Sequence, residues 1–71
     1  MTSFELHGSD HIQLNQLLKL LNLVESGGEA NQVILAGEVM VNGSIELRKR
    51  KKLYPGDRVE YDRKSIKIVD S

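Results

Sequence analysis

The spacing of apolar residues divides the chain into a helical first half and a second half of short strands. Two segments, beginning at Leu14 and Ala30, carry apolar or small residues at i, i+3, i+4 and i+7, which is the spacing of one helix face. These segments predict helices at Gln13–Asn22 and Gly27–Ala36, packed together through their leucine and valine faces.

The predicted second helix also carries signals for its two ends. Ser26 followed three residues later by Glu29 forms a capping box, in which each side chain is expected to accept a hydrogen bond from the other residue's backbone N–H. Gly37 is suited to the left-handed backbone conformation with which many helices end. The boundaries of this helix are therefore predicted at both ends.

From Glu38 onward the apolar period becomes two, which is typical of strands. Asn42-Gly43 indicates a hairpin between strands at Val39–Asn42 and Ile45–Leu47. A two-residue loop would pair Val41 with Ser44 and leave the apolar face opposite polar residues. We therefore predict a three-residue loop that pairs Val41 with Ile45, because a slip of one residue moves every side chain to the other face.

A second turn at Pro55-Gly56-Asp57 leads to a last predicted hairpin, with strands Arg58–Tyr61 and Ile66–Val69. A four-residue loop would place Tyr61 opposite Ile66. In the same register Val59 faces Ile68 and Glu60 faces Lys67. A further short strand is predicted at Ser3–Leu6.

The predicted fold class is α+β, with two short packed helices on a small, mostly antiparallel sheet with two hairpins. We expect eight side chains to form the core: Leu17, Leu18, Leu21, Ala30, Ile34, Val39, Val41 and Val59.

Length and composition limit the possibilities. The 71 residues suggest one domain, 1–71, near the lower size at which a chain folds unaided. The sequence has no cysteine, no apolar stretch long enough to span a membrane and no basic-then-apolar signal segment. We therefore expect a cytoplasmic protein, without membrane association, that is a monomer.

The charge distribution is uneven although the formal net charge is zero. Residues 1–47 hold one cation and six acids, whereas residues 48–67 hold nine cations and three acids. Five of these cations form the basic run Arg48-Lys49-Arg50-Lys51-Lys52. Such a run favours a polyanion partner, most often nucleic acid, although it could also be a solvated loop. In an extended segment alternate side chains would face opposite sides, unless the loop curls.

Catalytic or cofactor chemistry is not indicated. His7 and His11 have the spacing of metal ligands on a helix, but Gly8 and Ser9 between them favour a turn and no third ligand accompanies them. The carboxylates are scattered and no GxxxxGK phosphate loop occurs. We expect a non-enzyme without metal or cofactor.

The segment Ser26-Gly27-Gly28 has two interpretations. In the structural one, the serine caps the helix and the glycines permit a close entry against the first helix. In the functional one, a helix amino terminus without side chains at two positions lets a phosphate approach the backbone N–H groups. The neighbouring Glu25 and Glu29 would oppose an anion there.

The order of these motifs resembles the S-four type RNA-binding domain, named for the fourth protein of the small ribosomal subunit and built around an αL-type helix pair. The resemblance covers about residues 12–61 and is greatest with the small stand-alone bacterial proteins of the YaaA/YbcJ type. It rests on five segments: Leu14-x-x-Leu17-Leu18, Ser26-Gly27-Gly28-Glu29-Ala30, Gly37 to Gly43, Arg48 to Lys52, and Pro55 to Val59.

The resemblance implies an RNA-binding surface with a helical part and a loop part. The family positions correspond here to Ser26, Gly27, Gly28, Asn31, Arg48, Lys49, Arg50, Lys51 and Lys52. Most members have an arginine where this chain has Gly27, and the stand-alone type commonly has a basic residue where this chain has Asn31. Because these differences remove positive charge from the helical part, we expect the basic run to contribute more of the affinity for RNA.

Two functions therefore remain in view. One is binding of structured ribosomal or transfer RNA, in ribosome assembly or translation, through phosphate contacts and RNA shape. The other is docking of the basic loop on an acidic protein surface. With only Phe4, Tyr54 and Tyr61 as aromatic residues, binding of single strands by successive base stacking is disfavoured.

Overall fold

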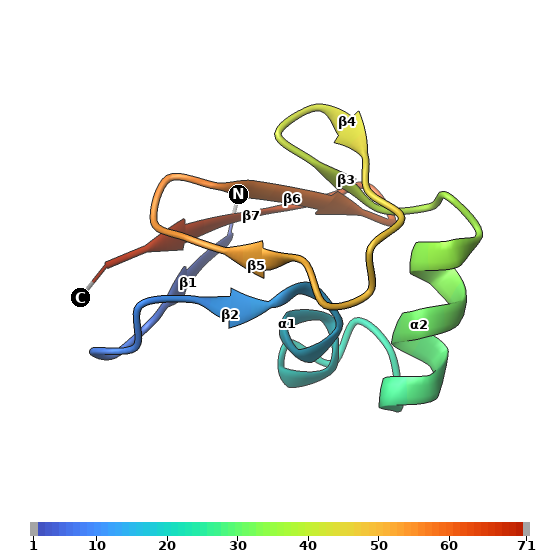
Figure 1. Ribbon diagram of the computed structural model, residues 1–71, viewed down its shortest axis with the longest axis horizontal. Helices are drawn as coiled ribbons and strands as arrows, with labels where there is room; N and C mark the ends of the chain where they lie inside the picture. The colour runs from blue at the N-terminus through green and yellow to red at the C-terminus, as the bar shows by residue number, and fades with distance from the viewer. Residues whose placement is uncertain (1, 71) are drawn as a thin grey trace.

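A computed structural model describes residues 2–70 (Figure 1). Nine helices and strands follow one another along this part of the chain: β1 (Thr2–Glu5), β2 (Ile12–Gln13), α1 (Leu14–Leu20), α2 (Gly27–Leu35), β3 (Met40–Val41), β4 (Ser44–Ile45), β5 (Lys52–Leu53), β6 (Arg58–Tyr61) and β7 (Lys64–Val69).

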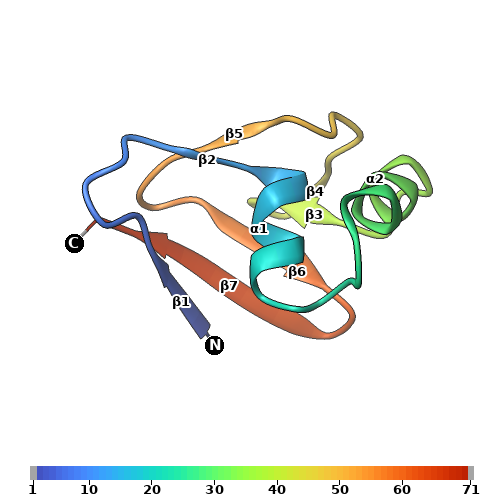
Figure 2. The ribbon, with the colours of Figure 1, turned by 90° about the horizontal axis from the view of Figure 1, so that it is seen from below.

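The strands form two sheets. Five strands pair in the order β1-β7-β6-β3-β4, and β2 pairs with β5 in a separate two-stranded ladder. All pairings are antiparallel except that of β1 with β7. In Figure 2, α1 lies across the face of β6 and β7, while α2 lies at one end of the sheet beside β3. The predicted α+β class is confirmed, with the strand predicted at Ser3–Leu6 forming the parallel edge.

The core lies between α1, α2 and the inner face of the larger sheet. Seven of the eight predicted core side chains are buried, and Leu21 is half-buried against the same cluster. Seven further buried residues complete it: Leu6, Ile12, Leu14, Val24, Leu53, Ile66 and Ile68. Leu6, Ile12, Val24 and Leu53 stand in or next to short segments, where too few residues are present to show a period.

The two helices end in the same way. Both are followed by a left-handed residue, Asn22 after α1 (φ 58°) and Gly37 after α2 (φ 77°). Each ending contains a backbone hydrogen bond five residues back, from Leu23 N to Leu18 O (3.0 Å) and from Glu38 N to Val33 O (3.1 Å). These are the bonds of a Schellman motif. The prediction for Gly37 is confirmed, and α1 ends earlier than predicted because Asn22 has the same role.

The start of α2 confirms half of the predicted capping box. The Ser26 hydroxyl accepts a hydrogen bond from Glu29 N (3.1 Å). The Glu29 carboxylate, however, accepts from Glu25 N (2.6 Å) and not from Ser26 N as predicted. The carboxylate therefore fixes the chain one residue before the cap.

The first hairpin has a two-residue loop, so the predicted register is wrong. Val41 lies opposite Ser44 and Met40 opposite Ile45. Asn42 and Gly43 both have positive φ, 53° and 85°, as a type I′ turn requires. The preference of Asn-Gly for this turn outweighs the burial of one more apolar side chain, and Ile45 remains 61% exposed.

The last hairpin also has a shorter loop than predicted. Tyr61 lies opposite Lys64, and Val59 lies opposite Ile66. Asp62 and Arg63 form the loop, again with positive φ at both positions. This register differs from the predicted one by two residues, so the apolar side chains keep the same face although every partner changes.

Candidate nucleic-acid interface

The basic run is not extended but folds into a turn. Lys51 N donates to the carbonyl of Arg48 (3.3 Å), which places Lys49 and Arg50 at the tip. Lys52 then begins β5, opposite Gln13 of β2. Of the two arrangements left open by the sequence, the structure shows the curled one.

Backbone hydrogen bonds hold this turn against the start of α1. Leu14 N donates to the Lys51 carbonyl (2.9 Å), and Asn15 N donates to the Lys49 carbonyl (3.1 Å). Gln13, at the cap position, forms no side-chain capping bond. The first N–H groups of a helix have no partner within it, so here the basic run supplies the acceptors. The position of the run is therefore fixed by the helix.

Arg48 differs from the other four cations because it is paired. Its Nε lies 2.9 Å and its Nη2 3.3 Å from the two carboxylate oxygens of Glu46, and its backbone N–H also donates to that carboxylate (3.1 Å). The Glu46 side chain is only 13% exposed. The side-chain hydrogen bond from Arg48 lowers the pKa of Glu46 below its ordinary value, and the Arg48 backbone N–H and positive charge add to this effect, while partial burial opposes it. Arg48 thus fixes the approach to the turn.

The other four cations of the run form no ion pair with any residue in the range 2–70. Lys49, Arg50 and Lys52 are exposed and Lys51 is half-buried. A hollow of about 490 Å³ is lined by Arg48, Arg50, Lys51, Lys52 and Tyr54, and we refer to it as the basic hollow. The structure therefore combines unpaired positive charge with a concave surface.

The helical part of the predicted surface has free space at its glycines. A Cβ at Gly27 would meet no atom within 4 Å, and one at Gly28 only the Ser26 hydroxyl at 3.8 Å. Neither glycine has a positive φ. Ser26 caps the helix as the structural interpretation expects, but close packing against α1 does not explain the two glycines. Their N–H groups stand in the first turn of α2, where the helix itself supplies no acceptor.

Of the four predicted helical positions, Asn31 is joined to the basic run. Its Oδ1 accepts a hydrogen bond from the side-chain amide of Asn15 (3.1 Å), the residue whose backbone binds Lys49. Within the described residues, Ser26, Gly27 and Gly28 form no hydrogen bond with the run. The structure thus joins the run to Asn31 in the second turn of α2, whereas the helix entry lies one turn earlier, at the amino end of α2.

Two residues of this surface were not predicted. Asn15 lies at the start of α1, where a polar side chain is a signal for a contact that fixes the helix end. Tyr54 was noted only as one of few aromatic residues, although it follows the run by two positions. It is 47% exposed, and its ring centroid lies 5.9 Å from that of His11.

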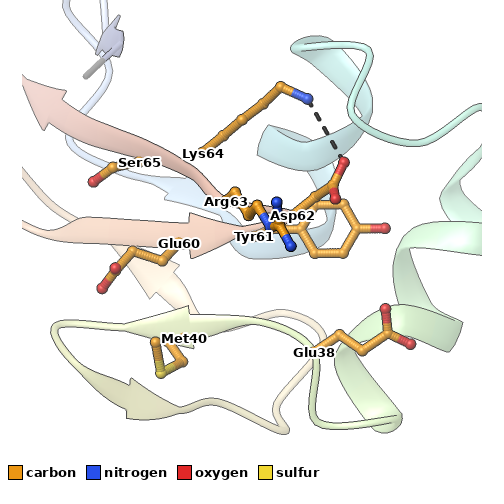
Figure 3. A pocket seen from close by; sticks show the side chains of 8 residues that line it. All are labelled: Glu38, Met40, Glu60, Tyr61, Asp62, Arg63, Lys64 and Ser65. Atoms are coloured by element: carbon orange, nitrogen blue, oxygen red, sulfur yellow. Dashed lines mark ion pairs between the residues drawn. The ribbon is translucent and has the colours of Figure 1, made fainter.

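A second hollow, of about 300 Å³, lies at the β6–β7 loop and has a different character (Figure 3). Glu38, Glu60 and Asp62 line it together with Tyr61. Partial burial, followed by the negative charges of Glu38 and Asp62, raises the pKa of Tyr61 above its ordinary value. An ion pair of 3.7 Å between Lys64 and Asp62 uses one of the two cations at its rim. Its carboxylates make this surface unsuited to a polyanion.

The two histidines have separate partners. His7 Nε2 lies 3.6 Å from the Glu5 carboxylate, and His11 Nδ1 lies 3.0 Å from that of Asp10. Within residues 2–70, no three His, Asp or Glu side chains are grouped as metal ligands. The same residues contain no helix that is long and apolar enough to cross a membrane.

Comparisons with known proteins agree with this geometry. YbcJ of Escherichia coli (strain K12), named for an inferred RNA-binding role, is 39% identical over 69 residues, which cover 97% of this chain and 99% of YbcJ. RlbA of Bacillus subtilis (strain 168), named for a probable role in ribosome maturation, is 41% identical over 54 residues, 76% of each chain.

The solution structure of Escherichia coli YbcJ superimposes with a TM-score of 0.73, covering 97% of this chain and 87% of YbcJ. That structure is described as revealing an αL motif involved in RNA binding. The sequence model of the S4 domain matches residues 4–69. With nearly the whole chain matched and the helix pair, sheet and basic turn in place, this protein belongs to the S4 domain family.

Proposed function

We propose that this protein binds structured RNA, ribosomal or transfer RNA, as a monomeric single-domain module without catalytic activity. The observation that carries the proposal is the fixed presentation of four cations, on a turn anchored to α1 and at the adjoining start of β5, that form no ion pair within residues 2–70. A preformed turn loses little conformational freedom when it binds, which favours affinity. Asn31 and the start of α2 extend the same surface, and the YbcJ description supports RNA as the ligand.

The proposed binding mode is recognition of shape and phosphate. Long cationic side chains contact the backbone of an RNA stem, and the rigid spacing between the run and α2 selects the geometry of that backbone. We place this activity in the cytoplasm, in ribosome assembly or translation. The similarity to RlbA, which is named for ribosome maturation, supports a role in ribosome assembly.

Filter binding of a folded RNA at several salt concentrations tests the proposal. For three to four phosphate contacts, log K should fall with log salt at a slope of roughly −2 to −4. The double variant Lys49→Gln/Arg50→Gln should make that slope shallower by about 1.4 to 1.8, since each lost contact removes about 0.7 to 0.9.

A matched variant with the same change in net charge, Lys19→Gln/Lys67→Gln, serves as the control. Both of these lysines are exposed and lie outside the basic run. The control variant should keep the wild-type slope. If the salt slope became shallower by the same amount in both variants, only a general effect of net charge would be indicated. Binding of polyglutamate as tight as that of RNA would instead favour docking on an acidic protein.

A further inference from the structure

The basic hollow contains an exposed aromatic ring among its cations. Arg50, Lys51 and Lys52 line it together with Tyr54, which keeps 47% of its surface exposed although the neighbouring Leu53 is fully buried. Tyr54 directly follows β5, and its side chain is exposed whereas that of Leu53 points into the core. A volume of about 490 Å³ lies within the usual range of small-molecule sites.

The position of Tyr54 is fixed by its backbone and by a neighbouring ring. Its N–H donates to the Asp57 carboxylate (2.8 Å), and its carbonyl accepts from Asp57 N (3.0 Å). The same carboxylate accepts from the Asn42 amide (3.0 Å), so the turn is also tied to the first hairpin. His11 lies beside the ring, tilted by 45°. Tyr54 is therefore presented on a rigid support.

An exposed ring beside unpaired cations matches the chemistry of a nucleotide. Aromatic side chains stack on the faces of unpaired bases, while cations bind the adjoining phosphates. A base within a continuous stem has both faces covered by its neighbours and cannot stack on a protein ring. Binding along a single strand uses successive aromatic rings, and Tyr54 is the one aromatic residue among those that line this hollow, so the site does not imply such binding.

We propose that the basic hollow takes one unpaired nucleotide, bulged or in a loop, of a structured RNA. Its base stacks on Tyr54, and its flanking phosphates contact Arg50, Lys51 and Lys52. This inference rests on the proposed RNA binding and adds to it the kind of RNA feature that is selected: a stem interrupted by an extruded nucleotide. Arg48, which also lines the hollow, is held by Glu46.

The test compares two RNA hairpins that differ only by a single bulged nucleotide in the stem. The wild-type protein should bind the bulged hairpin more tightly. Tyr54→Leu should lower affinity for the bulged hairpin by roughly 5- to 150-fold, the range expected for one base stacked on an aromatic ring, and change affinity for the continuous stem little. Tyr54→Phe should retain the preference, because the ring and not the hydroxyl stacks.

Two further measurements keep the outcome specific. Leu35→Ala removes another exposed apolar side chain, 60% exposed and on α2, and should leave both affinities unchanged. With 2-aminopurine as the bulged nucleotide, fluorescence should change on binding to wild type and Tyr54→Phe but not to Tyr54→Leu. Circular dichroism of each variant verifies that the fold is kept.

The results separate the two proposals. Equal affinity of the wild-type protein for both hairpins, or an equal loss for both in Tyr54→Leu, would overturn the nucleotide site and leave RNA binding by the basic run intact. Failure of the wild-type protein to bind either hairpin would overturn both.

Discussion

The side-chain amide of Asn15 donates a hydrogen bond to Oδ1 of Asn31 across 3.1 Å and ties the start of α1 to the second turn of α2. The backbone N–H of Asn15 simultaneously holds the carbonyl of Lys49 (3.1 Å). One residue thus connects the helix pair with the basic run. This bond also accounts for an asparagine at position 31, because a lysine or arginine side chain has no acceptor for the Asn15 amide.

The Asn15–Asn31 contact should be measurable as a coupling energy. Asn15→Ala and Asn31→Ala should each destabilise the domain, and the double variant should lose less than their sum by about 0.5–1.5 kcal/mol, the net value of one hydrogen bond. Urea unfolding of the four proteins provides the cycle. Strictly additive losses would show that the two amides do not interact in solution.

Arginine at position 27 should increase RNA affinity. Space is free around a Cβ at Gly27 and its φ is not positive, so Gly27→Arg adds a cation at the start of α2 without strain. The salt slope of RNA binding should become steeper by about 0.7 to 0.9, as for one additional phosphate contact. Gly27→Gln, a long but uncharged side chain, is the matched control. Identical slopes for the two variants would exclude RNA from this end of α2.

The Glu46–Arg48 pair should make the folding stability of the protein depend on pH in the acidic range. Because the pKa of Glu46 is lowered in the folded protein, its stabilising effect is complete above the ordinary carboxyl pKa, about 4.3, and disappears as pH falls through the lower folded value. NMR titration of the Glu46 carboxyl carbon should show a midpoint that rises toward the ordinary value in Arg48→Ala.

The same variant also tests the assignment of Arg48 to anchoring. Arg48→Ala should change the salt slope of RNA binding less than Arg50→Ala does, because Arg48 is already paired with Glu46. If Arg48→Ala made the salt slope of RNA binding shallower than Arg50→Ala does, Arg48 would have to leave Glu46 and bind phosphate.

Replacement of Leu18 should remove much of the stability of the domain. Leu18 is completely buried, and truncation of a buried leucine to alanine costs about 2–5 kcal/mol. Leu20→Ala, on the same helix but at a position 55% exposed, should cost less than about 0.5 kcal/mol. Equal melting temperatures for the two variants would contradict the orientation of α1.

Local sequence determined the helix pair and the signals that end α2. The buried faces of α1 and α2 follow from the spacing of apolar residues: Leu14, Leu17 and Leu18 in α1, and Ala30 and Ile34 in α2. A helix repeats every 3.6 residues, so burial of one face requires apolar residues at that period in the sequence. Ser26 and Gly37 mark helix ends because capping chemistry acts over a few neighbouring residues. The concentration of charge at 48–52 was equally visible.

The tertiary structure decided the registers and the assembly of the site. A two-residue strand such as β2 or β5 has no period, and its pairing depends on backbone hydrogen bonds between residues about 40 positions apart. In the hairpins, turn conformation competed with apolar pairing, and only the folded chain shows that the Asn42-Gly43 and Asp62-Arg63 turns prevail.

The composition of the site has the same explanation. Residue types alone assign five equivalent cations to the basic run, whereas the fold pairs Arg48 with Glu46 and leaves the other four without ion pairs among the described residues. It also brings Tyr54 into the basic hollow and Asn31 to Asn15. Such contacts join segments that are distant in the chain, so local sequence patterns supply the groups and long-range packing determines which of them meet.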